Sequence, residues 1–314
     1  MLLGIDIGGT SIKVGVFDID FTLIKKYSFP TKSFDNSSSF FDFLNQDISI
    51  ISDAYSVEAI GIGIPGLLSK ELILEKSPNL QFLEGVNLVE NLINKISVPV
   101  VIENDANMAA LSELIGKSNG NIDNFIFLTL GTGVGGSIII GGQPFQGDYG
   151  LAGEIGHIII ESNFDENVID YRTGTLESKC GKQGIIDYYK SIKGENESIG
   201  VKELTELAEN GDQIATKTLD HTAFHLASGI LSVIHTLNIC KIVIGGGIAN
   251  SNYLLQKTTN YVNKRVMYEN KALISINRAK HNEDSGVYGA AYCAKTKLLS
   301  IQQKEKNERN DFNK

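Results

Sequence analysis

Short runs of hydrophobic residues recur along the chain and alternate with longer stretches of helical spacing. The first two runs, 2–7 and 12–17, are rich in Ile, Leu and Val and are separated by four residues that include two glycines. Such a pair predicts a β-hairpin with a tight glycine turn. Residues 125–130 and 137–140 repeat this unit around the glycine-rich segment 131–136. The repetition predicts two related lobes, each beginning with a strand–glycine turn–strand unit.

Further strands and helices alternate between and after these two units, which predicts an α/β fold. We expect additional strands at 58–64, 98–103, 241–244 and 272–276. We expect helices at 37–53, 86–96, 105–115, 184–193, 201–209, 212–238, 250–267 and 285–298, and loops from 150 to about 183. The predicted domains are a small N-terminal α/β lobe at 1–115, with the helix near 285–300 packed back on it, a larger α/β lobe at 116–284 and a polar tail at 301–314.

The composition narrows the class of protein. The chain has 314 residues, of which 42% are hydrophobic, and this is enough to build sizeable cores. With 28 Lys and Arg against 37 Asp and Glu, the net charge is −9. A nucleic-acid binder needs a basic face to replace phosphate counterions, so this charge disfavours one. The three cysteines are widely spaced, and neither a secretory leader nor a membrane span is recognisable, so we expect a cytoplasmic protein without disulfides.

The first glycine turn has the features of a phosphate-binding loop. Gly8 and Gly9 allow an anion to approach backbone N–H groups, and Thr10 adds a hydroxyl donor. Asp6 stands on the strand just before the turn, where a carboxylate can hold Mg²⁺ or its water shell against phosphates. Taken alone, these residues also suit an ordinary glycine hairpin with a surface aspartate.

The second turn, 131–136, formally fits the GxGxxG pattern of dinucleotide-binding folds. That pattern requires a helix after the glycines, but the β-branched run 137–140 follows here, so we favour a second phosphate hairpin. Three more glycines, 245–247, lie between a predicted buried strand and a helix. They indicate either close approach of adenine or ribose to the backbone, or simply a tight turn.

Two acidic motifs supply candidate chemistry. Glu103, Asn104 and Asp105 follow a predicted strand, at the end where α/β sheets bind ligands. Asp105 can be a helix N-cap, but Asn104 is equally suited to capping, and phosphoryl transfer needs a base beside the attacking hydroxyl. Glu154 and His157 lie three residues apart and can face one ligand, the carboxylate accepting hydrogen bonds from two hydroxyls. A purely structural histidine is the alternative for His157.

Five motifs occur in order: DIGGT at 6–10, GIGIPG at 61–66, ENDAN at 103–107, LGTGVGG at 130–136 and GEIGH at 153–157. Together they resemble the ROK family (repressors, open reading frames and sugar kinases). The resemblance covers nearly all of residues 3–294 and implies a two-lobed actin/hexokinase-like ATPase fold of ribonuclease H-like lobes with a cleft between them. It also implies transfer of the ATP γ-phosphate, with Mg²⁺, to a hexose or N-acetylhexosamine hydroxyl, usually the 6-hydroxyl, with glucose favoured on family frequency. Relatives are commonly dimers or tetramers.

The resemblance also implies roles for individual residues. It makes Asp105 the catalytic base. The residues implied for sugar binding are Gly66, Asn79, Asn104, Asp105, Glu154, His157 and Glu177. The residues implied for nucleotide binding are Asp6, Gly8, Gly9, Thr10, Lys13, Gly131, Thr132, Gly133 and Gly246.

The chain departs from the family at one motif. Many members carry CxCGxxGC, whose three cysteines bind a structural zinc together with a histidine, but the equivalent positions here are Val168, Asp170 and Thr175. Cys180 is nearby but single, so thiolate ligands for a closed zinc site are missing. We therefore expect no metal site here, and we expect a backbone carbonyl or Asp170 to orient His157 in place of the metal.

Two other functions are alternatives to the kinase. A sugar-responsive ROK repressor carries a helix-turn-helix domain ahead of the DxGGT strand, whereas that strand starts at Leu2 here, and the acidic charge also disfavours DNA binding. A catalytically weak sugar-binding protein is conceivable because the cysteines are missing. The presence of Asp105, Glu154, His157 and both glycine turns argues against it.

Overall fold

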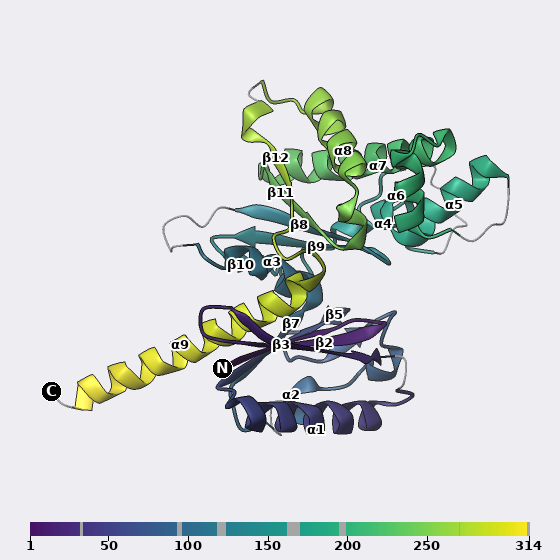
Figure 1. The fold of residues 1–314 in the computed structure, drawn as a ribbon. Coiled ribbons are helices and arrows are strands. Elements are labelled where there is room, and N and C mark those ends of the chain that lie inside the picture. The colour runs from purple at the N-terminus through teal and green to yellow at the C-terminus, as the bar shows by residue number, and fades with distance from the viewer. Residues whose placement is uncertain are drawn as a thin grey trace. The chain divides into compact units, whose positions relative to one another are not determined.

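The computed structural model describes residues 1–31, 34–92, 96–117, 124–161, 170–194, 199–269 and 271–312. The chain divides into two compact units. The first contains Met1–Ile122, Gly142–Ala152 and Asp284–Lys314, and the second contains Asp123–Gly141 and Gly153–Glu283. Each unit is built around a mixed β-sheet with helices packed on it (Figure 1).

The sheet of the first unit has the strand order β3-β2-β1-β4-β7. Its strands are β1 (Leu2–Ile7), β2 (Ser11–Phe17), β3 (Leu23–Pro30), β4 (Ala59–Ile64) and β7 (Val100–Asn104). Strands β1, β2 and β3 are antiparallel, whereas β1, β4 and β7 run parallel. The two short strands β5 (Leu67–Leu68) and β6 (Leu74–Lys76) form a separate pair.

Helices cover this sheet because their apolar residues recur on one face. In α1 (Ser37–Tyr55) the buried side chains are Phe40, Phe41, Leu44, Ile48 and Ile51. This spacing places them on one stripe, which packs into the core beneath the sheet. The other helices of the unit are α2 (Leu88–Asn91), α3 (Asp105–Leu111) and α9 (Ser285–Phe312), and the 3₁₀ turn Ser112–Leu114 continues α3.

Glycines allow α9 to lie directly on the strands and on α3. A Cβ atom at Gly61 of β4 would overlap the carbonyl oxygen of Ala290. A Cβ atom at Gly289 of α9 would overlap the carbonyl oxygen of Met108. Backbone therefore contacts backbone at both places, and α9 holds β4 and α3 in fixed positions.

The second unit repeats the topology of the first. Its strands are β8 (Phe125–Leu130), β9 (Val134–Ile140), β11 (Lys241–Gly245) and β12 (Ser275–Arg278), in the order β9-β8-β11-β12. The hairpin β8–β9 is antiparallel, and β8, β11 and β12 are parallel, as are β1, β4 and β7 in the first unit. Strand β10 (Gln143–Pro144) belongs to the segment assigned to the first unit. The duplication predicted from the two glycine-centred units is confirmed.

The helices of the second unit surround a core of aliphatic side chains. They are α4 (Leu176–Cys180), α5 (Lys182–Lys193), α6 (Val201–Glu209), α7 (Gln213–Leu237) and α8 (Asn252–Arg265). The longest of them, α7, is capped by Asp212, whose carboxylate accepts a hydrogen bond from the N–H of Ala215 at 2.7 Å. None of the described helices is long and apolar enough to cross a membrane.

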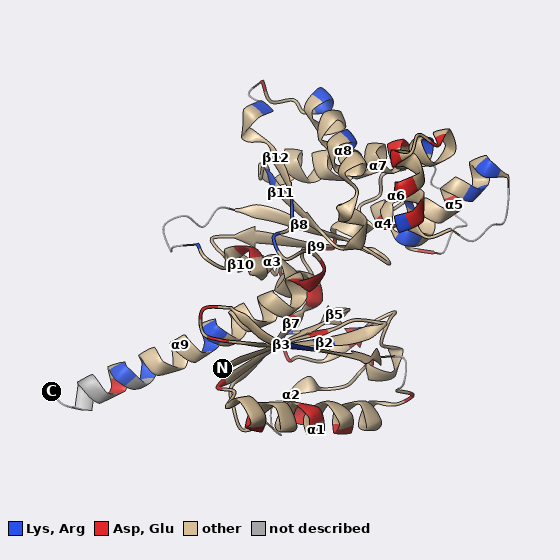
Figure 2. Ribbon diagram, viewed as in Figure 1, with Lys and Arg blue, Asp and Glu red and all other residues tan. Residues whose placement is uncertain are grey.

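Several predicted boundaries are wrong. The second glycine turn contains only 131–133, because β9 already begins at Val134. The helix predicted at 86–96 is the single turn α2 within its described part, and the loop predicted up to 183 contains α4. Helix α9 continues to Phe312 instead of ending near 298, so most of the expected polar tail is helical. Lys and Glu residues recur along the described part of this end (Figure 2). Lys304, Lys306 and Glu308 are exposed, and Lys and Glu favour helix in solvent.

An imidazole pair on α7 gives the second unit a specific response to acid. The Nε2 atoms of His221 and His225 lie 3.1 Å apart, and the ring of His221 stacks on that of Tyr188. Burial, followed by the charge of His225 and then that of Lys179, lowers the pKa of His221 to about 4, while Glu161 opposes this shift. The pair is therefore neutral at physiological pH.

Lowering the pH from 7 to 5 should destabilise the protein through this pair. In the unfolded chain a histidine has a pKa of about 6.5. Between about pH 6.5 and 4 the unfolded state therefore binds more protons than the folded state, so the protein becomes less stable as the pH is lowered. Because His221 is only partly buried, we expect a loss of about 1 kcal/mol, or about 2–4 °C in the unfolding midpoint. Thermal unfolding of His221→Gln should show a smaller acid-induced decrease than wild type, and an equal decrease would contradict this origin.

Candidate functional site

The first glycine turn joins β1 to β2 and is held by backbone hydrogen bonds. The N–H of Gly8 donates to the carbonyl oxygen of Ser11 at 2.9 Å. Thr31 supports the turn twice, because its hydroxyl donates to the carbonyl of Gly8 at 2.7 Å and its N–H donates to the carbonyl of Thr10 at 3.0 Å. The turn is therefore preorganised, which is what binding an anion through backbone groups requires.

Asp6 and Lys13 are direct partners across the β1–β2 hairpin. Burial raises the pKa of Asp6, while Lys13 lowers it and Asp284 raises it further. Helix α9 presses on this carboxyl group, since a Cβ atom at Gly286 would lie only 2.6 Å from Cγ of Asp6. A second nearby cation would stabilise such a buried carboxylate, so Asp6 fits a role beside a hard ion such as Mg²⁺.

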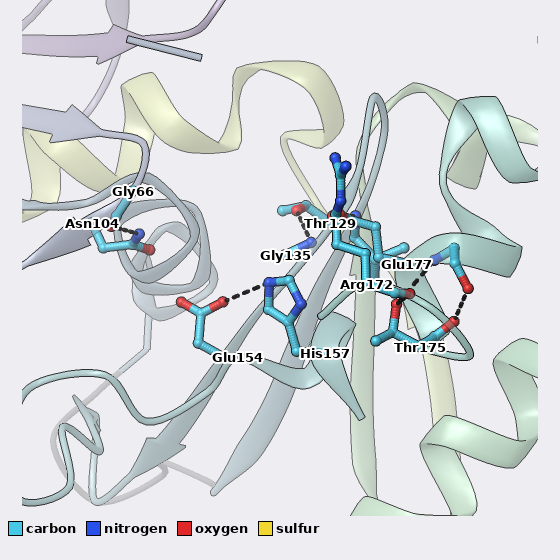
Figure 3. A network of polar contacts seen from close by, with 11 residues as sticks. Gly66, Asn104, Thr129, Gly135, Glu154, His157, Arg172, Thr175 and Glu177 are labelled. Atoms are coloured by element: carbon cyan, nitrogen blue, oxygen red, sulfur yellow. Dashed lines mark hydrogen bonds and ion pairs between the residues drawn. The ribbon is translucent and has the colours of Figure 1, made fainter. Parts of the chain in front are cut away.

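Four residues predicted to bind sugar lie in the first unit, namely Gly66, Asn79, Asn104 and Asp105. Asn79 packs on Gly9, where a Cβ atom would lie 2.7 Å from Cβ of Asn79. Gly66 has a positive φ of 119°, and its carbonyl oxygen accepts a hydrogen bond from the Asn104 side-chain amide at 3.1 Å (Figure 3). Buried Ser77 fixes the intervening loop by donating to the carbonyl of Pro65 at 2.8 Å.

Asp105 is the first residue of α3, immediately after β7. The side chain of Asn104 caps this helix, with its Oδ1 accepting from the N–H groups of Ala106 at 2.9 Å and Asn107 at 3.2 Å. Of the two possible caps, Asn104 and Asp105, the structure therefore shows Asn104 in the N-cap position. Oδ1 of Asp105 also accepts from the N–H of Ala106 at 2.9 Å, which fixes the rotation of its carboxylate.

Glu103 is a supporting residue that the sequence did not single out from its motif. Its Oε1 accepts hydrogen bonds from the N–H of Asn104 at 2.9 Å and from the side-chain amide of Asn107 at 3.1 Å. Glu103 thus joins Asn104, at the end of β7, to Asn107 in the first turn of α3. Only its place in the ENDAN motif could have indicated this role.

The second glycine turn, 131–133, joins β8 to β9. The N–H of Gly131 donates to the carbonyl of Gly133 at 3.0 Å, and the carbonyl of Gly131 accepts from the N–H of Lys182 at 3.0 Å. In the following strand, the N–H of Gly135 donates to the hydroxyl of Thr129 at 3.2 Å (Figure 3). The start of α5 therefore supports the same turn that the sequence predicts to bind phosphate.

Glu177 lies in the first turn of α4 and contacts this glycine turn. Its Oε2 accepts a hydrogen bond from the N–H of Val134 at 3.0 Å. A Cβ atom at Gly133 would overlap the same oxygen, so only glycine leaves room for it. The backbone of α4 is anchored in turn by the N–H of Leu176, which donates to the carbonyl of Ile158 at 2.9 Å.

Glu154 and His157 lie together in and beside the 3₁₀ turn Ile155–His157. Nε2 of His157 is 3.8 Å from Oε2 of Glu154, and both side chains are partly exposed (Figure 3). Burial raises the pKa of Glu154, His157 lowers it, and Glu177 raises it. Gly156 allows the turn to lie against β9, because a Cβ atom there would overlap the carbonyl oxygen of Val134.

Neither of the partners expected to orient His157, a backbone carbonyl or Asp170, bonds its buried Nδ1 within the described residues. Both carboxylate oxygens of Asp170 instead accept hydrogen bonds from the guanidinium of Arg172, at 3.2 Å each. This pair forms between residues only two apart, so it needs little ordering of the chain. The ring of His157 lies 5.6 Å from that of Tyr171, and its buried Nδ1 has no hydrogen-bond partner among the described residues.

The former zinc positions can be followed only in part. Val168 lies outside the described residues, whereas Thr175 caps α4 by accepting from the N–H of Ser178 at 3.3 Å. Cys180 is buried, and burial raises the pKa of its thiol well above the usual range. Within the described ranges, no three His, Cys, Asp or Glu side chains are grouped as a metal site.

Gly246 occupies the bend between β11 and the 3₁₀ turn Gly247–Asn250. Its φ is 87°, and a Cβ atom there would overlap the carbonyl oxygen of Leu130 at the end of β8. Both the backbone conformation and the close approach require glycine. The residue therefore fixes the spacing between two neighbouring strand ends in the second unit.

Known proteins resemble this chain in sequence and in fold. The ROK family description matches residues 2–297. The chain is 30% identical to the glucokinase of Thermotoga maritima, covering 95% of this chain and 98% of that protein, and 28% identical to the N-acetyl-D-glucosamine kinase of Haemophilus influenzae, covering 95% and 100%. A ROK family glucokinase from Streptomyces griseus, solved with glucose and AMPPNP, superposes with a TM-score of 0.79 at 25% identity, covering 94% of this chain and 99% of that one. The chain therefore belongs to the ROK family and has the actin-like ATPase fold that its motifs predict.

Proposed function

We propose that the protein is an ATP-dependent sugar kinase that phosphorylates the 6-hydroxyl of a hexose or N-acetylhexosamine, with glucose as the favoured acceptor. The observation that carries the proposal is the position of Asp105. It begins α3 directly after a parallel strand, while Asn104 provides the cap for that helix. Supporting this, relatives named glucokinase and N-acetyl-D-glucosamine kinase match almost the whole chain.

The two glycine turns would bind the phosphates of ATP. Backbone hydrogen bonds hold the first turn, whereas the second turn is held by the N–H of Lys182 at one end and by the side chain of Glu177 at the other. Mg²⁺ would neutralise charge on the phosphates, and Asp6 is the residue that would hold the ion or its water shell. Gly246, at the bend after β11, would lie against the adenosine.

Side chains that could hydrogen-bond a sugar are present in each unit. The second unit offers the carboxylates of Glu154 and Glu177, together with the imidazole of His157. The first unit offers Asn104 and Asn79, with Gly66 held by Asn104. Carboxylates accept from neighbouring hydroxyls in pairs, so this set suits a ligand rich in hydroxyl groups.

In the proposed reaction, Asp105 accepts the proton of the sugar hydroxyl as its oxygen forms a bond to the γ-phosphorus. The bond from the γ-phosphorus to the β–γ bridging oxygen breaks, and ADP leaves with that electron pair. ATP supplies the phosphoryl group, so the cytoplasm is the compartment we propose. The assembly as a dimer or tetramer stays a prediction.

A coupled assay of ADP release over a panel of sugars tests the function. The panel comprises glucose, N-acetylglucosamine, N-acetylmannosamine, fructose and allose, each with ATP and Mg²⁺. We expect ADP release that depends on at least one of them, and on glucose first. ADP release no faster than the rate without sugar, across the whole panel, would contradict the kinase and favour a binding protein.

A further inference from the structure

The carboxylate of Glu177 contacts the second glycine turn directly. Oε2 accepts from the N–H of Val134 at 3.0 Å and occupies the space beside Gly133 where another residue would place its Cβ atom. The ROK resemblance implies a sugar contact for this residue and does not predict a contact with the phosphate turn. The side chain of Glu177 could therefore contact both the glycine turn 131–133 and the sugar.

The turn 131–133 is held at its two ends by different kinds of contact. Backbone groups fix its first residue, because the carbonyl of Gly131 accepts from the N–H of Lys182. At its other end, the N–H of Val134 donates to the side chain of Glu177. A backbone contact persists when side chains change, whereas the Glu177 contact depends on the charge and rotamer of one residue.

We propose that Glu177 is a positioning residue that couples sugar binding to nucleotide binding. Its Oε2 sets the position of the phosphate turn through Val134, while its second oxygen accepts a hydroxyl of the sugar. This inference rests on the proposed kinase function, because it deepens the role of the same site.

The coupling follows from the cost of ordering one carboxylate for two ligands. A sugar hydroxyl that donates to Glu177 restricts the side chain to the rotamer that also receives the N–H of Val134. The nucleotide then binds a turn that is already ordered, so less conformational entropy of the turn is lost when the nucleotide binds. By linkage, the nucleotide must strengthen sugar binding by the same factor.

Electrostatics act in the same direction. Glu177 lies close enough to Glu154 for its charge to raise the pKa of Glu154, after the larger effect of burial. Without donors from a ligand, this repulsion weakens the hold of Glu177 on the turn, although its Oε2 still accepts from the N–H of Val134. When hydroxyl groups of the sugar donate hydrogen bonds to both carboxylates, the repulsion between them is reduced and Glu177 is held more firmly on the turn.

The experiment is calorimetric titration of a non-hydrolysable ATP analogue with Mg²⁺, in the absence and presence of saturating glucose. The variants are Glu177→Gln, which keeps the shape and a neutral acceptor, and Glu177→Ala, which removes both. Glu161→Gln is the matched control, because Glu161 lies on the segment paired with Gly174 and bonds Lys179 at 2.8 Å. Thermal unfolding establishes that each variant is folded.

We expect the affinity of the wild-type protein for the nucleotide analogue to be at least about 5-fold higher with glucose than without it, which is a typical coupling between two sites. Without glucose, Glu177→Ala should weaken nucleotide binding about 10-fold, because a hydrogen bond to a charged group is lost, and Glu177→Gln should weaken it less. In both variants the strengthening by glucose should fall towards 1-fold. The Glu161→Gln control should match wild type in both titrations.

Nucleotide affinity equal to wild type in folded Glu177→Ala would overturn the inference, as would full strengthening by glucose in Glu177→Gln. A general structural defect predicts a weakened nucleotide affinity with the glucose effect retained, and so counts against the inference. The kinase proposal is judged separately. If no sugar in the panel is phosphorylated but Glu177→Ala still loses nucleotide affinity, the kinase fails and the role of Glu177 on the turn stands. An active kinase with unaffected Glu177 variants overturns the inference alone.

Discussion

Replacing Asp105 with Asn should reduce kcat for sugar phosphorylation about 10²–10⁴-fold, the usual cost of removing a general base. An amide cannot accept the hydroxyl proton as the oxygen attacks. The fold should not change, because Asn keeps an oxygen that can accept from the N–H of Ala106, and Asn104 still caps α3. The measurement is kcat at saturating sugar and ATP, together with the affinity for ATP, which should stay within about 3-fold of wild type because Asp105 is not assigned to the phosphates.

Asp212→Asn is the matched control for this substitution. Asp212 also stands at a helix N-terminus and accepts a backbone N–H, that of Ala215 in α7, but it belongs to the second unit and has no assigned role in the chemistry. It should leave kcat unchanged. Full turnover in Asp105→Asn, or an equal loss in both variants, would contradict the role of Asp105 as the base.

Much of the fold was predictable because local patterns decided it. The runs 2–7 and 12–17 each contain consecutive β-branched or aliphatic residues on either side of two glycines, and they form the hairpin β1–β2 at nearly those bounds. The same holds for α1 and α7, whose apolar residues recur at helical spacing over many turns. In these segments local preference and tertiary packing agree, so either one is sufficient to identify the element.

The predictions failed where distant contacts decided the structure. Val134, Gly135 and Gly136 appeared to belong to the turn because glycine is a poor strand former. All three residues are in β9. Gly136 is needed there because the backbone of Gly153 packs against it, and a Cβ atom on Gly136 would lie 2.5 Å from the carbonyl oxygen of Gly153. Helix α4 was missed for a similar reason: it is short and is stabilised by contacts with segments far away in the sequence, such as the bond from Leu176 to Ile158.

The candidate site divides in the same way. The cap by Asn104 was predictable because a cap involves residues two or three apart. The contact between Glu177 and Val134 joins residues 43 apart, and no local pattern signals it. The pairing of Asp170 with Arg172 joins residues only two apart, so the sequence alone could have indicated it.

Gly289→Ala should lower the free energy of unfolding by about 2–3 kcal/mol, which is about 4–10 °C in the unfolding midpoint. In an open helix this change would stabilise by up to about 1 kcal/mol, because alanine is the better helix former. Here the new methyl group overlaps the carbonyl oxygen of Met108 and lies 3.2 Å from the N–H of Ser112. Both are backbone atoms, so α9 or α3 must move as a whole, and the cost of overpacking exceeds the gain in propensity.

The same substitution should also reduce kcat at temperatures where the protein is fully folded, because α3 begins with Asp105 and moves with Met108. Gly200→Ala is the control, since Gly200 precedes α6 with open space around it and an ordinary φ, and it should cost less than about 1 kcal/mol. Asp105→Asn should lower kcat at an unchanged midpoint, whereas Gly289→Ala should lower both. A midpoint at or above that of wild type in Gly289→Ala would show that α9 and α3 do not meet backbone to backbone, and the position of Asp105 would then need another support.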